Sequence, residues 1–448
     1  MTQSYSSHAR ATLALGLPII GSHLAQMALH VTDTVLLGWY SVTALAAVVL
    51  GASIFFIVFI LGSGFAQAVM PMVAAAVGRN DDIEARRDMR MAMWLSMLFG
   101  LFTYPLFWWS GAILRTLGQK PDVAQLAQDF LRIAGWGMIP ALLVMAFKSY
   151  LAALGRTQVV LWVTLLAVGV NFVLAWGLIF GNWGMVELGV KGAAVASLAV
   201  QVLTALVLAL YAAWLPELRH FRLFQRFWRV DPPAMSRVFR LGWPIGLTSL
   251  SETGLFVAAG LMMGWIGTVP LAAHGIAIEV ASLAFMFHLG LSNAATVRAG
   301  RASGEADAQS LRDGAKVAIA LSMAFGLIII AIFLIVPGPI ITLFLDLTDP
   351  DSPAIIAFGT RLLAMAALFQ IADAMQVMAL GLLRGIQDTR VPMMAAALSY
   401  WCIGIPASYV LAFRVDWGGV GLWFGLTLGL VVAASTMMWR FWHIAAKR

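Results

Sequence analysis

The sequence has few charged residues and a single cysteine. Asp, Glu, Lys and Arg make up 11% of its 448 residues, whereas soluble domains carry about 25%. Hydrophobic residues reach 61% and the mean hydropathy is +0.90. These values exclude an ordinary soluble domain and indicate an integral membrane protein. The one cysteine, Cys402, falls in an apolar segment where we expect it to be buried, and alone it can form neither an internal disulfide nor a cysteine metal site.

Sequence patterns of several other classes are also absent. No Gly-rich loop with a phosphate-binding lysine is present, so ATP is not the expected energy source. The basic residues are scattered among loops, and the net charge of +7 therefore predicts no nucleic-acid partner. The histidines within the apolar segments are dispersed and no run resembles a selectivity filter, which argues against a membrane enzyme and an ion channel. We expect a protein that is not an enzyme and has no cofactor.

Twelve apolar segments are long enough to cross a hydrocarbon core as helices. The first of them has no small-residue cleavage site, so we predict a retained helix and not a signal peptide. The expected spans are 12–38, 45–77, 91–111, 124–154, 158–181, 191–216, 237–265, 270–300, 314–338, 355–384, 391–413 and 418–444.

The distribution of Lys and Arg predicts the orientation. Most of the 28 basic residues fall in the loops on the side of the two termini, and Lys148 and Arg384 are counted among them. The positive-inside rule then places both termini in the cytoplasm. We therefore expect a multi-pass protein of the bacterial cytoplasmic (inner) membrane, surrounded by the lipid bilayer and present as a monomer.

The sequence contains an internal repeat. A shift of 226 residues aligns glycines and prolines without a gap, and "ALGRTQ" and "LRGIQDTR" occupy matching loops after the shift has grown by a few residues. Such residues mark helix kinks and close helix crossings. Aligned pairs include Gly16 with Gly242, Pro18 with Pro244, Gly64 with Gly290 and Gly78 with Gly304.

The repeat predicts the fold class and the domains. We expect an all-α polytopic membrane protein with twelve transmembrane helices in two six-helix lobes, related by a pseudo-two-fold axis along the membrane normal. The N-terminal lobe spans 1–216, a basic cytoplasmic linker 217–240 and the C-terminal lobe 241–448. Two bundles that face each other leave a cavity between them.

Four carboxylates lie deep within the expected spans, namely Asp33, Glu252, Glu279 and Asp373. An ionised side chain at a helix centre costs about 2.5–3.5 kcal/mol, so four unpaired ones would cost about 10–14 kcal/mol. We place no Lys or Arg at similar depth, apart from Arg132 near a span end, which leaves protons, metal cations or cationic substrates as partners. The alternative is a protonated carboxyl that only bonds a neighbouring helix. This alternative stays open for all four carboxylates. Around Asp33, Thr32 and Thr34 could share such a network. The alternative weighs most for Glu279, which lies nearer the outer end of its helix.

Several stretches carry a family resemblance. "LGWPIGLTSLSETGLF", "AAHGIAIEVASLAFMFHLGLSNAATVRAG" and "ADAMQVMALGLLRGIQDTRVP", together with the opening "VTDTVLLG", resemble the multidrug and toxic compound extrusion (MATE) family, in particular its bacterial NorM-like branch. The resemblance covers essentially the whole chain, and the motifs occur in the family's order.

The resemblance implies roles for the carboxylates. Asp33 matches the acidic residue of helix 1, and Glu252 and Asp373 match the cation site of the C-terminal lobe, where they would bind Na⁺ if sodium is used. Two positions depart from the family pattern. Phe369 lacks the hydroxyl of a tyrosine that helps to ligate sodium in relatives, and Glu279 replaces an asparagine. The first departure puts sodium ligation in doubt, and the second adds a proton-binding candidate.

These features together predict a secondary active multidrug efflux antiporter that exports organic cations and related toxic compounds in exchange for H⁺ or Na⁺ by alternating access. We expect a substrate cavity lined by Asp33, Glu252 and Asp373, with Phe369, Phe287 and Met286 among its apolar contacts. Protons are favoured slightly over sodium. The alternatives are a lipid-linked precursor flippase, whose cavity should be dominated by basic residues, and an exporter of one specific metabolite.

Overall fold

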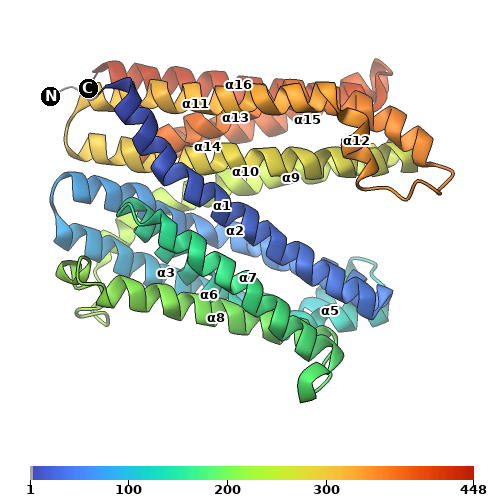
Figure 1. Ribbon diagram of the computed structural model, residues 1–448, viewed down its shortest axis with the longest axis horizontal. Coiled ribbons are helices and arrows are strands. Elements are labelled where there is room, and N and C mark those ends of the chain that lie inside the picture. Colours follow the sequence, from blue (N-terminus) through green and yellow to red (C-terminus); the bar gives the residue numbers. More distant parts are fainter. Residues whose placement is uncertain (1–3, 448) are drawn as a thin grey trace. The chain divides into compact units, whose positions relative to one another are not determined.

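The computed structural model describes residues 4–447, so residues 1–3 and 448, the extreme ends of the two expected lobes, lie outside the described part. These residues form helices and no strand (Figure 1). The first half contains α1 (Tyr5–Tyr40), α2 (Val42–Gly78), α3 (Asp82–Trp108), α4 (Ser110–Thr116), α5 (Pro121–Ala134), α6 (Met138–Ala153), α7 (Thr157–Phe180) and α8 (Val190–Trp214). The second half contains α9 (Pro232–Ile266), α10 (Thr268–Gly304), α11 (Ala308–Ile335), α12 (Pro337–Thr342), α13 (Ser352–Gly385), α14 (Arg390–Ala397), α15 (Ile405–Tyr409) and α16 (Gly418–Lys447).

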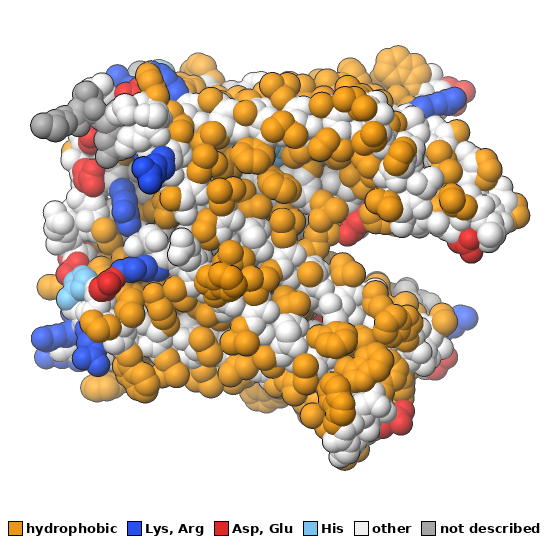
Figure 2. Space-filling view, in the orientation of Figure 1, with side chains coloured by type: hydrophobic (Ala, Val, Ile, Leu, Met, Phe, Trp, Pro, Cys, Tyr) orange, Lys and Arg blue, Asp and Glu red, His pale blue; other side chains and the backbone are white. Residues whose placement is uncertain are grey.

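The prediction of twelve spans is confirmed, because twelve helical segments of the described chain are long and apolar enough to cross a membrane. One span, Pro121–Ala153, joins α5 and α6, and another, Arg390–Arg414, joins α14, α15 and the π-helical segments Leu398–Gly404 and Val410–Arg414. Charged side chains gather near helix ends, while hydrophobic side chains cover the lengths between them (Figure 2). This apolar surface suits contact with lipid tails.

The helices form two compact units. The unit named here the N-unit is Gly21–Gly246, and the C-unit consists of Met1–Ile20 and Leu247–Arg448. The two unit boundaries, after Ile20 and after Gly246, are 226 residues apart, the same as the sequence repeat. The sequence-based domains follow chain order, whereas in the structure the first half of α1 packs with the C-unit.

The repeat is visible in the backbone. Asn80 and Ala306, which are 226 residues apart, both adopt a φ of 56° at the end of a long helix. Each is followed by an aspartate that caps the next helix: Asp81 accepts a hydrogen bond from the Glu84 amide and Asp307 from the Ser310 amide. These caps satisfy exposed amide groups. They explain why α3 and α11 begin several residues before the apolar segments expected at 91 and 314.

Glycine permits one close helix crossing in each unit. In the N-unit a Cβ on Gly64 of α2 would lie 2.2 Å from the Gly242 carbonyl oxygen of α9. In the C-unit a Cβ on Gly290 of α10 would lie 2.3 Å from the Ile20 side chain of α1. Because Gly64 and Gly290 are repeat-related, the same crossing occurs twice, as the aligned glycines suggested.

The expected basic linker is not a free loop. Asp231 pairs with Arg87 of α3, and Arg90 donates to the carbonyl oxygens of Gln225 and Arg226 at 3.2 and 3.1 Å. Trp94 Nε1 donates to the Phe227 carbonyl oxygen at 2.9 Å. The segment before α9 is therefore fixed to α3 within the N-unit.

The expected burial of Cys402 is wrong. Cys402 lies in the π-helical segment Leu398–Gly404 and its side chain is exposed, whereas Tyr400 in the same segment is fully buried. An apolar sequence context therefore does not distinguish the inward face of this helix from the face available to lipid.

Candidate functional site

The N-unit contains a cavity of about 510 Å³. This volume falls within the usual range of small-molecule sites. Its apolar wall includes Phe55, Phe56, Phe59 and Phe130, and its polar wall includes Gln26, His30, Asp33, Lys148, Thr164, Asn171, Ser197, Gln201 and Thr204. Helices α1, α2, α5, α6, α7 and α8 all contribute, so the site is built inside one helical bundle.

Asp33 lines this cavity and is held by two other helices. Asn171 Nδ2 of α7 donates to Asp33 Oδ1 at 2.6 Å, and Ser197 Oγ of α8 contacts Oδ2 at 3.4 Å. The expected threonine network is wrong, because the Thr32 and Thr34 hydroxyls bond to main-chain carbonyls of α1. Asp33 thus links helices and also presents a carboxylate to a ligand-sized space.

Lys148 was missed by the sequence analysis. It lies inside the Pro121–Ala153 span and lines the same cavity as Asp33, so the assignment to a cytoplasmic loop is wrong. Its Nζ is 3.4 Å from Gln26 Oε1. The span ends at Ala153, one helical turn later, and this proximity to the helix end is why charge counting placed Lys148 outside.

The C-unit brings Glu252 and Asp373 together. The two carboxylates, on α9 and α13, are close enough to interact electrostatically, and Asp373 is only 2% exposed. The sequence analysis placed no Lys or Arg at similar depth to neutralise them, and the lack of a basic partner is wrong for Glu252. Arg384, which belongs to α13, interacts electrostatically with Glu252.

Aromatic and amide side chains surround this cluster. Tyr400 is fully buried and interacts with both carboxylates, and its hydroxyl contacts Gln376 Nε2 at 2.7 Å. Phe369, one turn before Asp373, packs edge-on against Trp423, with ring centroids 5.5 Å apart. Tyr400 therefore supplies a hydroxyl near the carboxylates, although Phe369 does not. No sequence pattern we used singled out Tyr400.

Three other predicted residues lie on α10, away from the N-unit cavity lining. Glu279 and Met286 are half-buried, and Phe287 stacks on Phe325 of α11 with ring centroids 6.0 Å apart. Glu252, Asp373 and Phe369 likewise belong to the C-unit. Of the predicted substrate residues, Asp33 is the one that lines the N-unit cavity.

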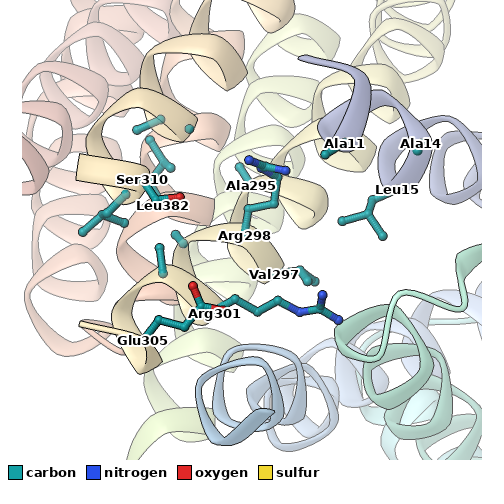
Figure 3. Close-up of a pocket in the computed structure, with 15 residues that line it drawn as sticks. Ala11, Ala14, Leu15, Ala295, Val297, Arg298, Arg301, Glu305, Ser310 and Leu382 are labelled. Atoms are coloured by element: carbon teal, nitrogen blue, oxygen red, sulfur yellow. The ribbon is translucent and has the colours of Figure 1, made fainter. Parts of the chain in front are cut away.

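A second cavity, of about 380 Å³, lies in the C-unit (Figure 3). Arg298 and Arg301 of α10 and Glu305, just after this helix, line it, together with Leu15 of α1 and Leu382 of α13. Arg298 contacts His8 Nδ1. None of the predicted site residues is among its lining residues.

The helical architecture is that of a multi-pass membrane protein, and the N-unit cavity has the size of a small-molecule site. A family model described as MatE matches residues 18–177 and 244–410, one segment in each half of the chain. The chain belongs to this family, and the resemblance seen in the sequence is confirmed.

Curated relatives match over nearly the full chain. A protein called "Probable multidrug resistance protein NorM" from Rhizobium meliloti (strain 1021) is 45% identical over 98% of this chain and 94% of its own length. One with the same name from Agrobacterium fabrum (strain C58 / ATCC 33970) is 43% identical, with the same coverage.

Solved structures support the fold. A structure titled "Outward-facing conformation of a multidrug resistance MATE family transporter of the MOP superfamily" has a TM-score of 0.89 at 20% identity and covers 98% of this chain and 96% of its own. A eukaryotic MATE transporter has a TM-score of 0.85 at 18% identity, covering 99% and 98%. At these identities the likeness concerns the fold alone.

Proposed function

We propose that this protein is a secondary active multidrug efflux antiporter that exports organic cations and related toxic compounds in exchange for H⁺ or Na⁺. The observation that carries the proposal is Asp33, a carboxylate in a cavity of about 510 Å³ with a wall of phenylalanines. Such a site suits flat organic cations, because the carboxylate attracts the charge and the aromatic faces contact the ring. The names of the curated relatives agree with this proposal.

The coupling ion acts at the C-unit cluster in this proposal. Asp373 is buried and Glu252 is half-buried, and their carboxylate oxygens suit binding of either protons or sodium. Substrate and ion drive alternating access because each ligand favours one conformation by its differential affinity. We favour the proton, because Phe369 offers no hydroxyl and a proton needs no cage of several oxygens.

One observation bears on the flippase alternative. Lys148 gives the N-unit cavity a basic residue, but Asp33 lies in the same cavity, and of the residues that line it only His30 is also ionisable. A cavity dominated by basic groups would favour a phosphorylated lipid precursor, whereas this one has both signs of charge. The antiporter proposal therefore fits its lining better.

Transport driven by one imposed gradient at a time tests the proposal. Vesicles containing the protein receive either a pH gradient or a sodium gradient, and ethidium movement is followed by fluorescence. We expect ethidium accumulation with the pH gradient in sodium-free medium. Transport that requires sodium and ignores the pH gradient would make sodium the ion, and no ethidium transport with either gradient would contradict multidrug antiport.

We further propose that both termini are cytoplasmic in the bacterial inner membrane. Cys402→Ser leaves a chain without cysteine, and single cysteines are then introduced at Thr348, in the loop before α13, or at Ala306, in the turn before α11. In intact cells a membrane-impermeant maleimide should label Thr348→Cys and not Ala306→Cys. The reverse labelling pattern would show that both termini lie on the outer side of the membrane.

A further inference from the structure

The N-unit cavity contains two opposite charges that do not form an ion pair. Asp33 and Lys148 both line it, yet among residues 4–447 no Lys or Arg lies within 4.0 Å of the Asp33 carboxylate and no carboxylate lies that close to Lys148 Nζ. A charge inside a helical bundle is costly unless it is paired or hydrated. Both groups are therefore open to charges on a ligand.

The two charges lie at different levels along α1. Lys148 contacts Gln26 and interacts electrostatically with His23, whereas Asp33 is two turns further along the same helix. Seven residues of helix separate Gln26 and Asp33, which corresponds to about 10 Å along the axis. This separation is too long for an ion pair and comparable to the length of a small aromatic molecule.

The polar contacts of the two residues differ. Asp33 accepts a short hydrogen bond of 2.6 Å from Asn171, which fixes its carboxylate, and has a long contact of 3.4 Å with Ser197. Lys148 has one long contact, 3.4 Å to Gln26, which leaves donors of its ammonium group for another acceptor. Gln201, which lines the same cavity, has a buried side-chain oxygen with no hydrogen-bond partner in the protein. This wall can therefore accommodate a polar ligand group.

We propose that Lys148 is a specificity-determining residue that binds the carboxylate of zwitterionic aromatic substrates, while Asp33 binds their cationic group. This inference rests on the proposed multidrug transport and assigns one residue of the cavity a role in substrate selection. A charge-assisted hydrogen bond from the ammonium to a carboxylate is strong in a site sheltered from water. Towards a substrate without an anionic group, Lys148 has the opposite effect, because its charge repels the cation.

A matched pair of dyes separates these two effects. Rhodamine 110 carries a free carboxylate on a cationic ring system, and rhodamine 123 is its methyl ester, with the cation alone. Binding of each dye to the purified full-length protein is measured by fluorescence anisotropy. Lys148→Met should weaken rhodamine 110 binding about tenfold or more and tighten rhodamine 123 binding about threefold.

Two further variants serve as controls. Lys148→Arg keeps the charge and should retain most of the preference for rhodamine 110, which shows that charge and not packing decides it. Lys191→Met removes an exposed lysine that pairs with Asp129 outside the cavity lining, and it should change neither affinity. Thermal unfolding of each variant identifies a misfolded protein, and Lys148→Gln then replaces Lys148→Met.

The outcomes distinguish this inference from the proposed function. If wild-type protein binds and transports rhodamine 123 but does not bind rhodamine 110, multidrug transport stands and the role of Lys148 is wrong. Equal changes for both dyes in Lys148→Met would also overturn that role. Wild-type protein that binds neither dye contradicts the proposed function and, with it, the inference. Opposite changes for the two dyes support it.

Discussion

The two units differ at the same positions of the repeat. Glu252 of α9 corresponds to Gln26 of α1 at the 226-residue shift. In the turns after α6 and α13 the shift between equivalent residues is 232. Gly155 and Gln387, which are 232 residues apart, both have a positive φ in these turns. Asp373 of α13 then corresponds to Ala141 of α6. The acidic pair of the C-unit is thus an amide and a small apolar residue in the N-unit.

This difference has a physical consequence. Gln26 and Ala141 both line the N-unit cavity, where a neutral and small pair leaves space for a ligand. Glu252 and Asp373 instead form a cluster near Arg384 and Tyr400. In the proposed function, one scaffold therefore carries two kinds of site, a roomy one suited to organic molecules and a compact one suited to small cations. Of the four predictions below, the first two test this division, and the other two compare the stability of repeat-related contacts in the two units.

The largest effect is expected at the compact cluster. Glu252→Gln and Asp373→Asn keep the side-chain shape and remove the negative charge, so each should abolish gradient-driven ethidium transport in vesicles. Because the N-unit cavity is unchanged, ethidium binding to purified protein should stay within about threefold of wild type. Full transport by either variant, with normal membrane levels, would show that the cluster does not couple transport to an ion.

Asp33→Asn should produce the complementary result. Loss of the carboxylate removes a charge-assisted contact to the substrate, and ethidium affinity should fall about tenfold. Binding of the coupling ion should persist, which the ion-dependent change in the fluorescence of a variant that keeps Trp423, beside Phe369, as its one tryptophan measures. The control is Glu187→Gln, which removes a carboxylate that accepts a hydrogen bond from Tyr40 and does not line the cavity. Unchanged ethidium affinity in Asp33→Asn would remove Asp33 from the substrate site.

The repeated helix crossing should tolerate substitution differently in the two units. Gly64→Ala places a methyl group 2.2–2.9 Å from main-chain atoms of Gly242 and Gly246, whereas in Gly290→Ala the nearest atom is Ile20 Cγ1 and the Ile20 main-chain atoms lie at 3.0 and 3.1 Å. Overpacking of this kind typically costs about 1–3 kcal/mol, and Gly64→Ala should lie at the upper end. Thermal unfolding in detergent measures both, with Gly275→Ala, where a Cβ meets no atom within 4 Å, as the control. A larger loss for Gly290→Ala would reverse the comparison.

The fold could be predicted from the sequence because it depends on quantities that a sequence contains. Span number follows from apolar length, and the repeated turns follow from glycine and aspartate at fixed spacing, as in Asp81 and Asp307. Glu252 and Asp373 were recognised as a pair through resemblance, and the structure brings them together.

The polar lining of the sites could not be predicted in the same way. Lys148 and Arg384 lie near the ends of apolar segments, where sequence alone does not show whether a long side chain points back into the bundle or towards water. Tyr400 lies in a π-helical segment, which shifts the inward face relative to a regular helix. Such directions depend on tertiary packing, as the exposed Cys402 of the same segment shows.

The smallest effect concerns a repeat-related contact at the helix starts. Arg87 pairs with Asp231 in the N-unit, and the corresponding residues of the C-unit are Asp313 and Tyr5, whose hydroxyl donates to Asp313 Oδ1 at 3.3 Å. The hydrogen bond from Arg87 lowers the pKa of Asp231 below its ordinary value of 3.8. A lowered pKa in the folded state means that Asp231 stabilises the protein fully above about pH 4 and loses this contribution as the pH falls through the lowered value.

Asp231→Asn should therefore cost about 1 kcal/mol at pH 7, seen as a small decrease in Tm, and the decrease should shrink at acidic pH. Tyr5→Phe, in the exposed C-unit contact, should lower Tm less and with a smaller pH dependence, because a neutral hydroxyl stabilises a carboxylate less than a guanidinium does. Equal and pH-independent decreases in both variants would show that the ion pair adds nothing beyond a neutral hydrogen bond at this position.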